Sequence, residues 1–240
     1  MKLRYDLHLH SCLSPCGDND MTPNNIVGMA GLLGYDIIAL TDHNSCRNTP
    51  AAVEAGKRAG ITVVPGMELC TREEAHVVCL FPKVEAALSF GEWVEKRSPK
   101  IPNRPEIFGE QLILDQEDQV IGKESRLLIA AADIGLYEVL GLARSYGGTA
   151  FPAHVDKDSY SITASLGGIP PEIGFCTAEL SARANREEQL GRYPELKGMR
   201  LLRDSDAHYL ENMPDPEAVL ELEENTAECL IALLDRKIII

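Results

Sequence analysis

Seven short apolar segments alternate with helical patterns along most of the 240 residues. This alternation is typical of repeated strand-helix units around a mainly parallel sheet. The sequence predicts strands at Leu3–Leu9, Asp36–Leu40, Thr62–Pro65, His76–Phe81, Thr149–Pro152, Thr177–Leu180 and Met199–Leu202. It predicts helices at Thr22–Leu33, Pro50–Ala59, Val84–Lys96, Ile134–Tyr146 and Thr226–Arg236. With 45% hydrophobic residues, a chain of this length can bury the core of one barrel-sized domain.

Two segments interrupt the alternation. Ser98–Gly122 is first rich in Pro, Asn and Gly and then has two apolar runs around an acidic turn, which predicts an insertion carrying a hairpin. Such an insertion could be a lid over the site, a dimer contact or a structural elaboration. Asp156–Gly174 has the composition of a long loop. We therefore expect a single domain over residues 1–240 with an insertion at about 98–122.

The formal net charge of -14 disfavours a stable complex with duplex DNA or RNA, because long nucleic-acid contacts depend on a stripe of Lys and Arg. Nucleic acid is expected only as a short substrate or a chain end. No apolar run is long enough to span a membrane, and the amino-terminal residues lack the apolar region of a secretory signal. The sequence leaves the oligomeric state open.

The seven cysteines are odd in number and have no paired spacing that suggests a disulfide framework. Reduced thiols in a cytoplasm are the simplest interpretation. Cys12, Cys16 and Cys46 lie close in sequence to histidine motifs, so a thiolate metal ligand is an alternative to the buried structural role that free cysteines usually have.

All six histidines lie at or just beyond the ends of predicted strands. In the first strand, His8 and His10 project to the same side, because alternate residues of a strand share a face. The remaining histidines and three acids lie at the ends of later segments, where His76 begins one strand and the others follow theirs: Asp42, His43, Glu68, His76, His154, Asp206 and His208. In a barrel of parallel strands the carboxyl ends meet at one rim, where these side chains would converge. Imidazole nitrogen combined with carboxylate oxygen suits Zn, Mn or Fe and argues against a closed structural zinc site.

This set of motifs resembles the PHP (polymerase and histidinol phosphatase) family of metal-dependent phosphoesterases. The resemblance rests on motifs spread in the family's order over nearly the whole chain: His8-Leu9-His10, Thr41-Asp42-His43, Glu68, His76, Pro152-Ala153-His154 and Ser205-Asp206-Ala207-His208. It implies a distorted (β/α)7 barrel related to the TIM barrel, two to three divalent ions (Zn, Mn or Fe), and phosphoester hydrolysis.

The resemblance also implies three ligand sets. His8 and His10 would share the first ion with Glu68 and Asp206, and Glu68 would bridge to a second ion held by His76 and His154. His43 and His208 would hold the third ion together with an acid from the loop after the first motif. Family members have Ser-Asp-Gly in that loop, whereas this chain has the longer sequence Ser14–Asp20. Counting back from Pro23 favours Asp18, and Asp20 is the alternative.

The expected mechanism follows from these ligands. Clustered divalent ions lower the pKa of a bound water to about 7 and neutralise phosphoryl oxygens. The residues expected to take part in catalysis are Glu68, His154, Asp206 and Asp42. Asp42 would fix a neighbouring imidazole by accepting its free N–H, and the alternative is that Asp42 is an exposed acid.

Arginine offers a bidentate contact for the substrate phosphate. Arg183 and Arg186, after the sixth strand, are the leading candidates, and Arg47 and Lys157 are the next. The expected substrate is a small phosphorylated metabolite, a nucleotide or a short oligonucleotide end. Two alternatives remain: a related barrel hydrolase acting on amide or lactone bonds, and a metal-binding regulatory domain without turnover.

Overall fold

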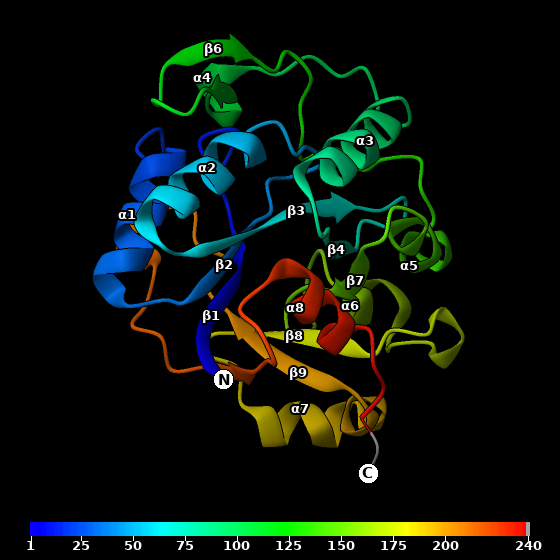
Figure 1. Ribbon diagram of the computed structural model, residues 1–240. Coiled ribbons are helices and arrows are strands. Elements are labelled where there is room, and N and C mark those ends of the chain that lie inside the picture. Colours follow the sequence, from blue (N-terminus) through cyan, green and yellow to red (C-terminus); the bar gives the residue numbers. More distant parts are fainter. Residues whose placement is uncertain (239–240) are drawn as a thin grey trace.

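The computed structural model describes residues 1–238, and its main feature is a six-stranded mixed sheet in the order β10-β1-β2-β3-β4-β7 (Figure 1). The strands of this sheet are β1 (Lys2–Leu9), β2 (Ile37–Leu40), β3 (Thr62–Cys70), β4 (His76–Leu80), β7 (Thr149–Pro152) and β10 (Val219–Glu221). Two further strand pairs are β8 (Thr177–Ser181) with β9 (Arg200–Asp204), and β5 (Leu112–Leu114) with β6 (Val120–Lys123). All seven predicted strands are therefore confirmed.

The sheet is mixed because one strand is reversed. β1, β2 and β3 pair in parallel, whereas β4 is antiparallel to both β3 and β7. The connection between β3 and β4 contains only residues 71–75, which is too short for the crossover that parallel strands need. The reversal places the first residue of β4, His76, at the same rim as the carboxyl ends of β1, β2 and β7.

The sheet curls toward a barrel without closing it. A hydrogen bond from the Val155 N–H to the Glu179 carbonyl (2.9 Å) connects the end of β7 to β8. A bridge between Leu9 and Ala207 connects the end of β1 to the residues after β9. Within residues 1–238, no ladder joins β7 to β8 or β9 to β1. The structure therefore confirms a mixed α/β fold with a curled sheet, and the complete (β/α)7 barrel that the sequence predicted is not confirmed.

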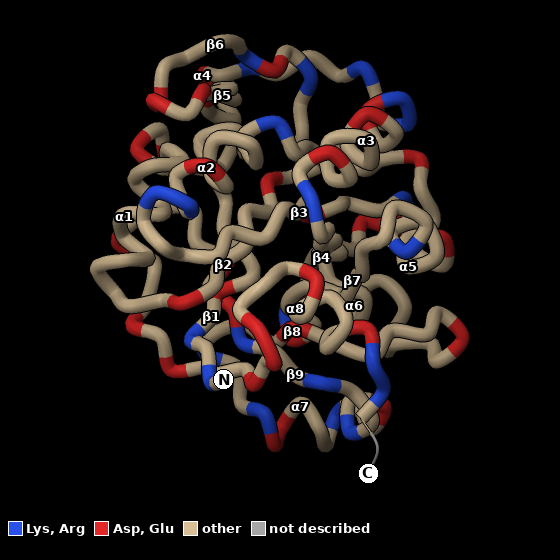
Figure 2. Tube along the Cα trace, viewed as in Figure 1, with Lys and Arg blue, Asp and Glu red and all other residues tan. Residues whose placement is uncertain are grey.

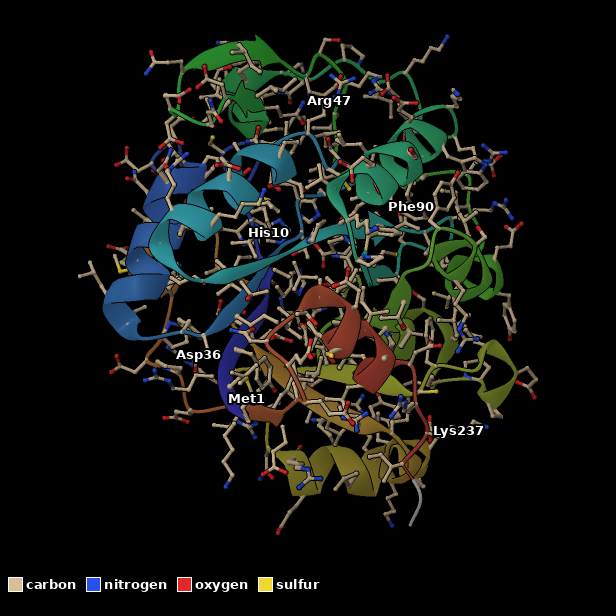
Figure 3. All side chains as sticks on the ribbon, in the orientation of Figure 1. Met1, His10, Asp36, Arg47, Phe90 and Lys237 are labelled. Atoms are coloured by element: carbon tan, nitrogen blue, oxygen red, sulfur yellow. The ribbon has the colours of Figure 1, made fainter. Side chains whose placement is uncertain are left out.

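Four predicted helices lie on the outside of the strands (Figure 1): α1 (Pro23–Leu33), α2 (Thr49–Ala59), α3 (Val84–Glu95) and α5 (Leu136–Ser145). The fifth, α8 (Ala227–Leu234), lies across the middle of the view and packs with residues of β1, β2, β3, β4 and β7. α1 begins as its sequence predicts, because the Thr22 hydroxyl accepts from the Asn25 N–H and Pro23 is the first helical residue. Gly34 ends it in a left-handed conformation (φ 85°). On the α3 side of the core, Phe90 packs against Phe81 with ring centroids 4.8 Å apart (Figure 3).

The segment predicted as a long loop, 156–174, contains the short helix α6 (Ile162–Leu166) and a 3-10 turn at Pro171–Ile173, so that prediction is wrong in part. The remaining short helices are α4 (Pro105–Phe108) and α7 (Arg186–Arg192), and further 3-10 turns lie at Pro194–Gly198 and Leu210–Asn212. Among residues 1–238, no helix has both the length and the apolar character needed to cross a bilayer.

The segment predicted to carry a hairpin does so, and it packs beside the loop after β1. β5 and β6 pair in antiparallel fashion. The Leu112 N–H donates to the Cys12 carbonyl (2.8 Å), and the Asn48 side chain hydrogen-bonds the backbone of Leu112 and Leu114. Gly109 lies so close to the Pro15 carbonyl oxygen that a Cβ added at this position would clash with it. The hairpin segment therefore holds the loop that follows His10.

Candidate metal centre

Eight predicted ligand side chains converge at one end of the curled sheet. His8 and His10 come from β1, His43 follows β2, Glu68 lies in β3 and His76 begins β4. The other three, His154, Asp206 and His208, follow β7 and β9. In Figure 3, His10 lies in the interior of the fold, at the level of α2 and β3. The histidines that the sequence places at strand ends thus lie together in one cluster.

Glu68 is fully buried at the centre of this cluster. Its Oε1 lies 2.8 Å from His76 Nδ1 and 3.2 Å from both His8 Nε2 and His154 Nε2. Its Oε2 lies 2.9 Å from His43 Nδ1 and 3.4 Å from His10 Nε2. Burial alone would raise the pKa of Glu68, but the imidazoles of His76, His8 and His43 outweigh it and hold the pKa well below its usual range. A carboxylate whose two oxygens face different imidazoles is suited to bridge two cations.

Asp206 provides a second acid at the edge of the cluster. Its Oδ1 lies 3.1 Å from His10 Nε2 and 3.5 Å from His8 Nε2. Burial would lower the pKa of His8, but Glu179, Glu68 and Asp206 together raise it well above its usual value. Negative charge is therefore concentrated around an imidazole nitrogen, as expected where a cation binds.

Three groups of ligand atoms are close enough to hold an ion each, with all atoms of a group within 4.8 Å of one another. The groups are His8, His10, Glu68 and Asp206; His43, Glu68 and His76; and His10, His43 and His208. Buried polar atoms of these groups without a hydrogen-bond partner are Glu68 Oε2, Asp206 Oδ1 and His43 Nδ1. Buried polar atoms are nearly always paired, so these atoms fit a centre completed by cations. The first group has the composition predicted for the first ion, whereas the second contains His43 in place of His154 and the third contains His10 in place of a loop acid.

Two of the ligand-bearing residues have unusual backbone conformations. His154 has φ 29° and Asp206 has φ 54°, which is the left-handed region that side chains other than glycine rarely adopt. Each such residue costs about 1–3 kcal/mol of conformational energy. The surrounding contacts hold both residues in this conformation, in which the His154 side chain faces Glu68 and the Asp206 side chain faces His10.

Hydrogen bonds on the outer side of the imidazoles fix which nitrogen faces the centre. The Ser14 hydroxyl donates to Asp42 Oδ1 (2.7 Å), so its oxygen is left to accept from His10 Nδ1–H (2.9 Å). The Nδ1–H of His208 donates to the Asp206 carbonyl (2.8 Å). With Nδ1 protonated, Nε2 of each ring is free to bind an ion. Asp42 thus acts on His10 through Ser14, whereas the sequence suggested a direct contact with an imidazole.

Glu179 was missed by the sequence analysis. It is fully buried in β8, where its Oε2 accepts from His8 Nδ1–H (2.8 Å) and its Oε1 accepts from the His154 N–H (3.0 Å). One carboxylate therefore orients two of the predicted ligands. The sequence did contain a signal for its role: Glu179 lies inside a predicted apolar strand, and a buried charge there needs partners.

Several predicted residues lie elsewhere. Asp18 belongs to none of the three groups among the described residues, and its Oδ1 instead accepts from the Asp20 N–H (2.8 Å). Arg186 is the exposed first residue of α7. Arg183 lines a separate cavity of about 530 Å³ together with Asp204. The cation beside the cluster is Lys157, whose Nζ lies 2.6 Å from Asp206 Oδ2.

This site has the ligand set of a metal-dependent hydrolase. Residues 6–164 match the PHP domain family, which is more than half of the chain, and the chain belongs to this family. The resemblance seen in the histidine motifs is thereby confirmed.

Similar proteins act on nucleic acids. A 5'-3' exoribonuclease from Haemophilus influenzae is 33% identical over 118 residues, which cover 45% of this chain and 42% of the exoribonuclease. The lesion-specific endonuclease Q from Pyrococcus furiosus has a TM-score of 0.73 at 18% identity, over 98% of this chain and 56% of that one. A structure of endonuclease Q with a 27-mer duplex substrate has a TM-score of 0.65 at 18% identity, over 88% of this chain and 50% of that one. The chain thus spans less than half of the exoribonuclease and about half of the endonuclease.

These similarities correct the prediction about partners. Net charge was taken to exclude stable binding of duplex nucleic acid, yet endonuclease Q, a protein of this fold, has been captured on a 27-mer duplex substrate. Net charge is a sum over the whole chain, whereas binding depends on charge at the contact surface. Figure 2 shows Lys and Arg interspersed among the acidic residues along the trace. The sum of -14 therefore excludes no nucleic-acid substrate.

Proposed function

We propose that this chain is a metal-dependent phosphoesterase that hydrolyses phosphodiester bonds of a nucleic acid. The observation that carries the proposal is the buried carboxylate of Glu68, which lies within 3.4 Å of nitrogens from five histidines. A domain that only binds metal would not need this arrangement, in which ligands for more than one cation surround a single acid. The exoribonuclease and endonuclease similarities support a nucleic acid over a small metabolite as the substrate.

In this proposal the protein side chains hold the ions and orient the substrate. The divalent ions, when bound, activate a water and neutralise phosphoryl charge. His8, His10, Glu68 and Asp206 would hold one ion, and His76 and His154 would share Glu68 with a second. Glu179 and the Asp42-Ser14 pair would keep the imidazoles in the required tautomer. Zn, Mn and Fe all suit these nitrogen and oxygen ligands.

Lys157 replaces Arg183 and Arg186 as the proposed contact for the substrate phosphate. Its side chain is 41% exposed, and its ammonium lies at the rim of the centre against Asp206. Asp206 is also a member of the first ligand group, so an ion in that group would compete with Lys157 for the carboxylate. The ammonium would then be free to bind an anion beside the ions.

Local charge supports this substrate despite the acidic composition. Two or three divalent ions would bring four to six positive charges to the position where a phosphate must bind.

All seven cysteines are free, which supports a reducing compartment such as the cytoplasm as the place of action.

The test is hydrolysis by the purified protein, stripped of metal and then loaded with Mn, Zn or Fe. The substrates are 5'-phosphorylated single-stranded RNA and DNA, duplex DNA with an abasic site, and p-nitrophenyl phosphate. We expect cleavage of at least one nucleic acid, lost on Glu68→Gln and kept in Glu172→Gln, an exposed acid in a 3-10 turn remote from the ligand groups. Lys157→Met should raise KM more than it lowers kcat. Full activity of Glu68→Gln, or cleavage of the small ester alone, would refute the proposal.

A further inference from the structure

The loop after β7 carries two residues of the proposed site. His154 is a candidate ligand that faces Glu68, and Lys157 is the proposed contact for the substrate phosphate. The loop continues through Tyr160 and ends at α6. There the Ser161 hydroxyl caps the helix by accepting from the Ala164 N–H (3.1 Å), and it donates to the Lys157 carbonyl (2.6 Å). These bonds fix the position of Tyr160 relative to the rest of the loop.

The ring of Tyr160 lies beside the metal centre. Its centroid is 5.1 Å from that of His76, and the two ring planes are 32° apart. The Tyr160 carbonyl also accepts from the His76 N–H (3.0 Å). His76 shares one ligand group with Glu68, and Asp206 shares another with Glu68. Since Lys157 pairs with Asp206, the tyrosine ring and the lysine ammonium lie beside the same centre.

Tyr160 has a backbone conformation that a tyrosine rarely adopts. Its φ is 52°, in the left-handed region that disfavours bulky side chains. The residue is nevertheless 52% exposed, so burial of the ring in the core does not account for the strain. Strain of this kind persists only where surrounding contacts impose it, and it is concentrated at ligand sites. The loop therefore presents an aromatic ring at the edge of the centre.

The ring borders a cavity of about 580 Å³, a volume in the usual range for ligand pockets. This cavity lies between α6 and the short connection from β3 to β4, and its lining residues are Glu73, Glu74, Ser159, Tyr160, Ala164, Ser165 and Leu166. The charged lining residues in the described structure are the two glutamates. Carboxylates repel a phosphate, but they accept hydrogen bonds from the amino groups at the edges of nucleobases. The cavity therefore suits a base better than it suits the sugar-phosphate backbone.

We propose that Tyr160 is a stacking platform for an unpaired nucleobase next to the scissile phosphate. The inference rests on the proposed function, because it takes the substrate to be a nucleic acid whose phosphate binds at the ions. The ring contacts a ligand histidine, so a phosphate bound at the ions and Lys157 would place its own nucleoside beside the ring. Every base has a π-face, and only an unpaired base can offer it to a side chain. Tyr160 thus directs the site toward single-stranded ends and flipped-out nucleotides.

Fluorescence of 2-aminopurine tests the stacking without using activity. The probes are single-stranded DNA tetranucleotides with phosphorothioate linkages, which resist cleavage, and each has 2-aminopurine at a different position. Titration with the Zn-loaded protein should quench the fluorescence at one position, because the base there stacks on the ring. Tyr160→Ala should remove the quenching and weaken binding between about 5-fold and about 150-fold, whereas Tyr160→Phe should preserve both. Tyr137→Ala changes an exposed tyrosine of α5 that does not line the cavity, and it should alter neither.

An abasic probe separates stacking from a structural effect on His76. Removal of the base at the quenched position should weaken binding to the wild type by the same factor as Tyr160→Ala does. It should not weaken binding to Tyr160→Ala any further, because the two changes remove one interaction. The Zn²⁺ content of the two proteins should be equal. If Tyr160→Ala weakens binding of the intact and abasic probes by the same factor, the substitution acts on the centre itself and the inference is overturned.

The two proposals fail in different ways. Cleavage of nucleic acid by a protein that quenches none of the probes would overturn the role of Tyr160 and leave the proposed function intact. Quenching that depends on Tyr160, in a protein that cleaves none of the substrates, would support the role of Tyr160 and overturn the proposed function.

Discussion

Glu179→Gln is the sharpest test of how the centre is held together. The Glu179 carboxylate accepts two hydrogen bonds, one on each oxygen, from His8 Nδ1–H and from the His154 N–H. Glutamine has the same shape but only one acceptor oxygen, so its NH₂ group must face one of these two donors. Either His8 changes tautomer and carries a proton on the nitrogen that should bind an ion, or the His154 N–H loses its partner.

The expected loss of metal affinity follows from these two outcomes. Loss of such a support typically lowers metal affinity by about 10–100-fold, which corresponds to roughly 1.4–2.7 kcal/mol. An unpaired buried N–H at His154 would cost a comparable 1–3 kcal/mol or so. We therefore expect the first ion to bind at least about tenfold more weakly in Glu179→Gln than in the wild type.

The assay is a titration of the metal-free protein with Zn²⁺ in competition with a chelating dye. Glu124→Gln is the matched control, because Glu124 is also buried but pairs with Arg126. This control should lose stability without losing affinity for the ion. Unchanged affinity in a folded Glu179→Gln protein would show that Glu179 does not orient His8.

Two further predictions concern stability. Burial would lower the pKa of His76, but the neighbouring Glu68 raises it from 6.5 to about 10 in the metal-free protein. Protonation of His76 thus favours the fold, and its contribution is complete below about pH 6.5 and is lost as the pH rises toward 10. The Tm of the metal-free protein should fall over this range and that of the Zn-loaded protein should fall less; parallel curves would contradict this. Gly17→Ala should destabilise the fold by about 1–3 kcal/mol in urea, because its Cβ would lie 2.5 Å from the Ser11 carbonyl oxygen. Gly28→Ala in α1 meets no atom within 4 Å and should be neutral or stabilising.

The elements of the fold and most of the site follow from local rules. The two-residue period of a strand placed His8 and His10 on one face, and Thr22, Pro23 and Gly34 marked both ends of α1. The direction of β4 was missed because β3 continues five residues beyond its predicted end at Pro65. This extension leaves a short turn that permits only antiparallel pairing. Strand length depends on tertiary pairing with β4, which a local pattern does not contain.

The ligand orientations depend on contacts between distant residues. Glu179 reaches His8 across 171 positions, and its role is visible only once β8 lies against the ends of β1 and β7. The left-handed backbone at His154 and Asp206 has no sequence signature either, because it is imposed by the surrounding packing. Sequence patterns therefore identify which residues come together, while the tertiary fold determines how their side chains are oriented.

The loop after β1 shows this limit most clearly. Counting along the chain favoured Asp18 as a ligand, since it treats the loop as a simple extension toward Pro23. The folded loop instead turns at Ser14 and again at Asp18, through hydrogen bonds to the Ser11 and Asp18 carbonyls. These turns commit the Asp18 carboxylate to the loop itself, where it accepts from the Asp20 N–H. A residue's distance along a loop therefore does not define the direction of its side chain.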